Sequence, residues 1–121
     1  MPSPRTRIGT SAEIVAAAEL GKRGYEIVAS NYRCQFGEID LIANEDNSLV
    51  FVEVRCKRTG NYGTPADSIT SSKIRKIVTT AQHYLDINAL TDIACRFDVV
   101  EVVLIDGKLV VKDVIRDAFT A

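Results

Sequence analysis

The chain has 121 residues, of which 46% are hydrophobic and 26% are charged. This length is typical of one globular domain, and a chain of this size buries enough surface to fold without disulfide or metal support. The composition excludes a disordered or a collagen-like chain. No apolar run approaches the roughly 20 residues that a membrane-spanning helix requires. No signal-peptide core follows the first seven residues, so we expect a cytoplasmic protein that does not contact a membrane.

The polar residues narrow the classes of site. The three cysteines are odd in number and lack CxxC spacing, which argues against a disulfide framework and a zinc knuckle. The net charge of −1 is not the overall charge of a typical nucleic-acid binder. The charges are segregated, however, because residues 36–53 carry five acids and no base, whereas residues 55–76 carry six bases and one acid. Such blocks are expected of a solvated surface, or of a metal site beside a phosphate-binding track.

Two helices are predicted. The first covers residues 10–23, after a flexible arm at residues 1–7, and Thr10 with Glu13 fits a capping box at its start. The second covers residues 70–86, where apolar side chains recur every three to four positions.

Five strands are predicted from β-branched and apolar residues and from the turn residues between them. They cover residues 25–32, 38–43, 49–57, 96–105 and 109–115. The fourth strand is apolar on both faces, so we expect it inside the sheet. The order α-β-β-β-α-β-β predicts the α/β class, with one domain over residues 1–121 in which helices flank a mixed β-sheet.

The second and third strands form a predicted hairpin that carries the chemistry. If Asp46 and Asn47 are the two central turn residues, the numbers of paired residues sum to 93, and Asp40 lies opposite Glu53. Side chains alternate along a strand, so the opposite face of the hairpin is wholly apolar and must meet the core. That apolar face comprises Ile39, Leu41, Ala43, Val50, Val52 and Val54.

Two facing carboxylates require a proton, a base or a cation between them. Oxygen ligands of this kind suit Mg²⁺ or Mn²⁺. Arg55 and Lys57 follow Glu53 on the same face, and cations beside a metal suit phosphoryl chemistry. The alternative is a solvated strand face on which Glu38 pairs with Arg55 across the hairpin.

The segments GEIDLIA at residues 37–43 and VFVEVR at residues 50–55 resemble the YraN-like family of uncharacterised bacterial proteins. The resemblance covers nearly the whole chain. It implies a restriction-endonuclease-like fold of the PD-(D/E)xK nuclease superfamily, similar to Holliday-junction resolvases.

This resemblance implies that Asp40 and Glu53 hold a metal ion. It also implies that Glu13 adds a third acid, although a helix cap is an equal alternative for Glu13. The final motif position is usually lysine and is Arg55 here. Because arginine stays charged, it cannot act as a general base, and Lys57 could take part of the lysine's role.

Two functions remain open for this fold, beside a structural or scaffold protein whose acid–base face is only a salt-bridge ladder. The first is a metal-dependent endonuclease that hydrolyses phosphodiester bonds in branched or single-stranded DNA, with Lys73, Arg58 and Tyr62 contacting the nucleic acid. The second is a nucleic-acid-binding module that does not cleave. We favour DNA over RNA, and the resemblance also allows a homodimer. For Asp98 we expect a structural salt bridge, to Arg96 or to the first helix.

Overall fold

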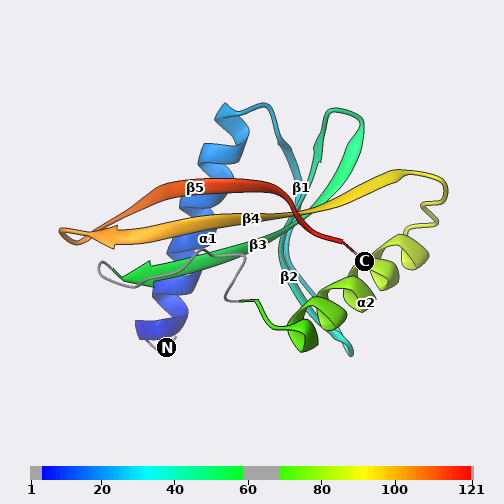
Figure 1. Cartoon of the computed structure of the whole chain (residues 1–121), viewed down its shortest axis with the longest axis horizontal. Coiled ribbons are helices and arrows are strands. Elements are labelled where there is room, and N and C mark those ends of the chain that lie inside the picture. Colours follow the sequence, from blue (N-terminus) through cyan, green and yellow to red (C-terminus); the bar gives the residue numbers. More distant parts are fainter. Residues whose placement is uncertain (1–3, 59–68, 121) are drawn as a thin grey trace.

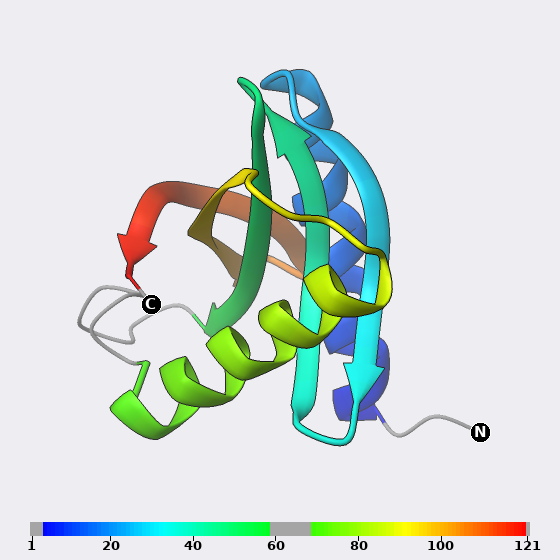
Figure 2. The same ribbon diagram turned by 90° about the vertical axis from the view of Figure 1, so that its right-hand side faces the viewer.

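The computed structural model describes residues 4–58 and 69–120, with side chains described for residues 11–57 and 69–120. It has an α/β fold in which one mixed five-stranded sheet, in the order β1-β2-β3-β4-β5, packs between two helices (Figures 1 and 2). The helices are α1 (Pro4–Lys22) and α2 (Ser71–Ile87). The strands are β1 (Glu26–Cys34), β2 (Gly37–Glu45), β3 (Ser48–Arg58), β4 (Ala94–Ile105) and β5 (Lys108–Phe119). The predicted element order is therefore confirmed.

Helix α1 begins earlier than the sequence predicted. It starts at Pro4 and includes the last four residues of the expected arm at 1–7; residues 1–3 lie outside the described part of the chain. Proline suits the first position of a helix, because its fixed φ is helical and its missing N–H has no partner there. The predicted capping box is wrong, because both Thr10 and Glu13 lie inside the helix.

The central hairpin is buried on both faces. Leu41 and Val52 pack with Ala16 and other residues of α1, while Ile42 and Phe51 pack under α2. Near the turn, α2 therefore covers the face of the hairpin that carries Asp40 and Glu53. The alternation of side chains along the strands did not predict this cover. Burial on both faces is typical of a strand inside a sheet that has helices on each side.

The predicted register of this hairpin is confirmed. Leu41 pairs with Val52, and Asp46 and Asn47 have φ values of 52° and 62°, as a two-residue type I′ turn requires. The pairing ends at Leu41, beyond which β2 stays with β1 while β3 continues beside β4, in parallel, to Arg58 (Figure 1). The two strands therefore diverge at Asp40. Ile39, which was predicted to share the face of Leu41, packs with the α2 cluster instead, because β3 no longer sets its face.

A buried polar network lies at the other end of the sheet. Asp98 is fully buried and accepts hydrogen bonds from the Tyr25 hydroxyl (2.7 Å), from Arg96 Nε (3.0 Å) and from the Asp117 backbone N–H (2.9 Å). Arg96 also donates to Glu45 Oε1 at 2.6 Å. The expected salt bridge between Asp98 and Arg96 is confirmed. The network around it links β2, β4 and β5 with Tyr25, the residue before β1.

Within the described residues, neither helix is both long and apolar enough to cross a membrane.

Replacing Asp98 by alanine should lower the free energy of unfolding by about 3 kcal/mol, because the buried Arg96 guanidinium loses its main counter-charge. Urea unfolding followed by circular dichroism measures this. The matched control is Asp86→Ala, which removes an exposed carboxylate and should change the value by less than about 0.5 kcal/mol. Equal effects of the two substitutions would show that the network does not stabilise the fold.

Candidate functional site

A cavity of about 340 Å³ opens where β2 and β3 diverge. It is lined by residues from both helices and from both strands. These are Ala12, Glu13, Asp40, Glu53, Val54, Arg55, Cys56, Lys57 and Lys73. Six residues singled out in the sequence therefore line one space: Glu13, Asp40, Glu53, Arg55, Lys57 and Lys73.

The divergence of the strands positions Asp40. Its Oδ2 accepts a hydrogen bond from the Val54 backbone N–H at 2.7 Å, next to the last backbone pair of the hairpin. The carboxyl group thus supplies an acceptor that β2 no longer offers through its backbone. A buried N–H needs such a partner, so this contact holds the Asp40 side chain against β3.

Asp40 and Glu13 form a carboxyl pair. Burial, followed by the negative charges of Glu53 and Glu13, raises the pKa of Asp40 from 3.8 to about 8; the Val54 N–H and Lys73 oppose this increase. Burial also raises the pKa of Glu13, whose side chain is hydrogen-bonded to Asn31 and Asp40. Two carboxyl groups share a hydrogen bond only if one is protonated. With a pKa of about 8, the Asp40 carboxyl group is mostly protonated at neutral pH, and its O–H donates the hydrogen bond to Glu13.

Glu53 is the most buried of these acids, with 6% of its surface exposed. Its Oε1 lies 2.7 Å from Lys73 Nζ and 3.8 Å from a terminal nitrogen of Arg55. The first turn of α2 holds Lys73 in place, because Thr70 caps the helix by accepting the Lys73 backbone N–H at 3.1 Å. The sequence marked Lys73 as a phosphate contact and missed its pairing with Glu53.

Three further residues belong to this region and were not identified from the sequence. Asn31, with φ of 52°, is hydrogen-bonded to Glu13. Glu101 is 5% exposed and stands beside Arg55 in the parallel register of β3 and β4. Cys56 lines the cavity and is exposed. Only Asn31 offered a sequence signal, since asparagine tolerates a positive φ better than most residues.

Other predicted contacts are absent or cannot be placed. Glu38 pairs with Arg33 at 3.0 Å, so its predicted pairing with Arg55 is wrong; at this level β2 lies beside β1 and has left β3. Arg58 ends β3, but its side chain lies outside the described part of the structure, and Tyr62 lies outside the described residues altogether.

The acids are not arranged as a ready-made metal site. Among the described side chains, no three from aspartate, glutamate, cysteine and histidine converge closely enough to hold a metal ion. The chemistry of the cavity is still distinctive. A buried carboxylate, a protonated carboxyl and a third acid share one space with basic side chains from β3 and α2.

The raised pKa of Asp40 predicts how stability varies with pH. Between about pH 4 and pH 8, the folded protein retains a proton that the unfolded chain has released. Unfolding free energy should therefore fall as pH rises through this window, by at most about 1.4 kcal/mol per pH unit.

Asp40→Asn should remove this contribution, because the amide oxygen can still accept the Val54 N–H while the side chain no longer titrates. Urea unfolding at pH 5, 6.5 and 8 should show that the variant gains stability relative to wild type as pH rises. Asp86→Asn is the control, since its carboxylate is exposed. Parallel stability curves for Asp40→Asn and wild type would contradict the prediction.

Comparison with known proteins gives the chain a family. Residues 12–102, which include every residue of the cavity, match the model of Uncharacterised protein family UPF0102. A UPF0102 protein of Saccharophagus degradans is 50% identical over 95 residues, which cover 78% of this chain and 80% of the relative. Another, of Desulfosudis oleivorans, is 42% identical over 121 residues, which cover 100% of this chain and 96% of the relative. The chain therefore belongs to the UPF0102 family, the YraN-like family that its sequence resembles.

Proposed function

We propose that this protein is a metal-dependent endonuclease that hydrolyses phosphodiester bonds in nucleic acid, with DNA as the preferred substrate. One observation carries the proposal. Asp40 on β2 and Glu53 on β3 line the same cavity as Arg55, Lys57 and Lys73. Acids for a cation and bases for a phosphate thus occupy one space.

The donor set fits Mg²⁺ or Mn²⁺ held mainly by two carboxylates. Mg²⁺ in proteins commonly keeps several water ligands and uses one or two carboxylates together with substrate phosphates, so three converging acids are not required. Burial, and then the negative charges of Glu53 and Glu13, raise the pKa of Asp40, so the cavity holds acids that the protein's own cations do not fully balance. A divalent cation would balance them and release the Asp40 proton. Once that proton has left, Glu13 would no longer share it with Asp40 and could accept a hydrogen bond from a water molecule in the cavity.

The residues around the acids have separable roles in hydrolysis. When bound, the metal would lower the pKa of its water and polarise the phosphate. Arg55 keeps its charge, so it would stabilise negative charge on the phosphate and would not remove a proton from the water. Lys57, on the same face of β3, would add to this field. Lys73 would turn from Glu53 to a phosphate oxygen once Glu53 binds the cation.

The net charge of the chain indicates which form of DNA is the better substrate. The affinity of a protein for duplex DNA grows with the number of phosphates that its basic residues neutralise. A protein with a net charge of −1 therefore has little general attraction for a duplex. Branched or single-stranded DNA therefore suits it better than long duplex DNA. A homodimer, which the family resemblance allows, would double the number of phosphate contacts.

A second function is favoured by the pairing of Glu53 with Lys73. In a nucleic-acid-binding module that does not cleave, this ion pair would be permanent, and Arg55 would serve only to contact phosphate. The two functions differ in whether Glu53 ever exchanges its ammonium partner for a metal ion.

A cleavage assay separates them. Wild type should cut at least one of linear duplex, single-stranded, flapped or four-way-junction DNA in the presence of Mn²⁺ or Mg²⁺. Glu53→Gln and Asp40→Asn should each reduce the rate about a hundredfold or more, since each removes a metal-binding carboxylate. Glu38→Gln, which alters an exposed acid of β2, the strand that carries Asp40, should cut like wild type.

Three results would count against the endonuclease. Equal cutting by wild type and Glu53→Gln, purified identically, would reveal a contaminating nuclease. Binding of DNA without cleavage would favour the non-catalytic module. Failure to bind or cut any of the substrates would overturn both functions.

Metal binding can be measured without DNA. Lys73→Met should bind Mn²⁺ about tenfold more tightly than wild type, because it removes the positive charge 2.7 Å from the Glu53 carboxylate. Electron paramagnetic resonance of free Mn²⁺ during titration gives the dissociation constant. Lys76→Met, one helical turn further along α2, is the control and should match wild type. Unchanged or weaker Mn²⁺ binding by Lys73→Met would mean that the ammonium and the cation do not compete for Glu53.

A further inference from the structure

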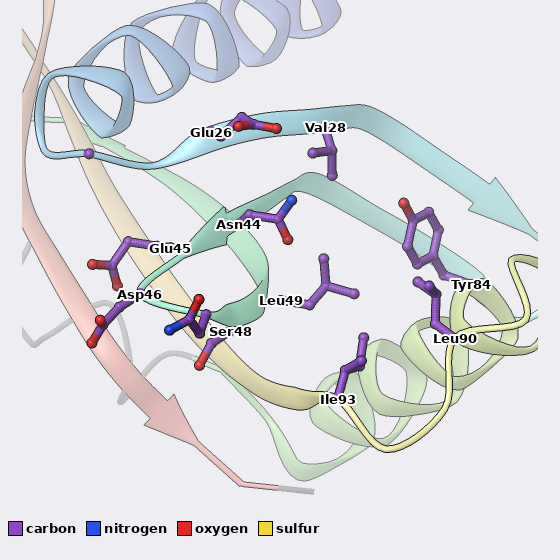
Figure 3. Close-up of a pocket in the computed structure, with 12 residues that line it drawn as sticks. Glu26, Val28, Asn44, Glu45, Asp46, Ser48, Leu49, Tyr84, Leu90 and Ile93 are labelled. Atoms are coloured by element: carbon purple, nitrogen blue, oxygen red, sulfur yellow. The ribbon is translucent and has the colours of Figure 1, made fainter.

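A second groove, of about 550 Å³, lies at the turn end of the β2–β3 hairpin (Figure 3). Its walls come from the start of β1, from the hairpin turn, from the C-terminal part of α2 and from the segment that follows α2. Asp46, on its rim, is six residues from Asp40 along the hairpin. At the rise of an extended strand this corresponds to about 20 Å, so the groove is separate from the acid-lined cavity.

One end of this groove is apolar. Leu49, Tyr84 and Leu90 form its floor, and Val28 and Ile93 stand at its sides, each with 41% of its surface exposed. Figure 3 shows these five side chains directed toward a common space. Exposed aliphatic side chains that converge in this way, bordered by polar residues, are characteristic of interaction surfaces.

The other end of the groove is acidic. Glu26, Glu45 and Asp46 line it, and none of its twelve lining residues is a lysine, an arginine or a histidine. Glu45 is already paired with Arg96 and Arg116, at 2.6 and 2.9 Å, whereas Glu26 and Asp46 are exposed at the rim. Asn44, Asn47 and Ser48 add hydrogen-bonding groups beside these acids.

We infer that this groove is a docking site for a basic, amphipathic segment of a partner protein. An apolar floor next to acidic side chains complements a helix that carries aliphatic residues on one stripe and lysine or arginine beside it. The same acids repel phosphates, so the groove does not suit nucleic acid. Because the groove and the acid-lined cavity lie about 20 Å apart along the hairpin, both can be occupied at once, and the inference does not depend on the proposed nuclease activity.

Fluorescence anisotropy with two designed peptides tests the inference. The probe is a labelled 14-residue amphipathic helix of leucine and lysine; its counterpart has glutamate in place of every lysine. We expect saturable binding of the basic peptide with a dissociation constant on the order of 10 μM, and at least tenfold weaker binding of the acidic one. Glu26→Gln combined with Asp46→Asn should weaken binding of the basic peptide and reduce its dependence on salt.

Matched substitutions locate the binding site. Val28→Lys and Ile93→Lys should each weaken peptide binding at least tenfold, because they place a cation in the apolar end of the groove. Val110→Lys and Ile105→Lys are the controls, because each alters an aliphatic residue that is 46% exposed but does not line the groove. All four variants should keep the circular dichroism spectrum and melting temperature of wild type within a few degrees.

Four outcomes would overturn the inference. The first is that the basic peptide does not bind, and the second is that the acidic peptide binds as well as the basic one. The third is that all four lysine variants bind the peptide alike. The fourth is that sedimentation shows a wild-type dimer that Val28→Lys or Ile93→Lys dissociates, which would make a second copy of this chain the occupant.

Discussion

Strand β3 has β2 on one edge and β4 on the other, and the two pairings differ in length. It is antiparallel to β2 only as far as Val52, whereas its parallel pairing with β4 continues to Arg58. Beyond Val52, β2 turns away from this edge, and a side chain accepts the hydrogen bond from the Val54 N–H. Asp40 does so at 2.7 Å. The candidate site therefore exists because the sheet diverges there, and Asp40 both completes the sheet's hydrogen bonding and begins the acid-lined cavity.

Charge compensation follows from this geometry. The divergence brings Asp40 near Glu53, and α1 adds Glu13, so three acids share a poorly solvated space. Without a metal, the protein balances them with a proton on Asp40 and with the ammonium group of Lys73 on Glu53. Both compensating charges are ones that a divalent cation would displace. In the proposed function, this same cluster binds the cation.

The other polar features of the molecule lie at the opposite end of the β2–β3 hairpin from the acid-lined cavity. The Asp98–Arg96–Glu45 network ties together strands at the turn end of the hairpin through short contacts from Arg96 to Asp98 and to Glu45. The acid-rimmed groove lies at that same end. The hairpin therefore carries the acid-lined cavity, in which acids and bases are mixed, at one end, and the groove lined by acids without bases at the other.

The sequence by itself determined the element order and the hairpin register from Leu41 and Val52 to the turn. These follow from local rules, because Asp46 and Asn47 accept the positive φ of a tight turn, and alternation then assigns each side chain to a face. Tertiary structure decided where that register stops. Because the β2–β3 pairing stops at Leu41, Glu38 pairs with Arg33 and not with Arg55. For the same reason, Ile39 packs with the residues under α2. Tertiary structure also decided that Lys73, twenty residues beyond Glu53, reaches that carboxylate. Such contacts depend on how α2 is laid across the sheet, and no local pattern encodes the distance between two groups so far apart in the chain.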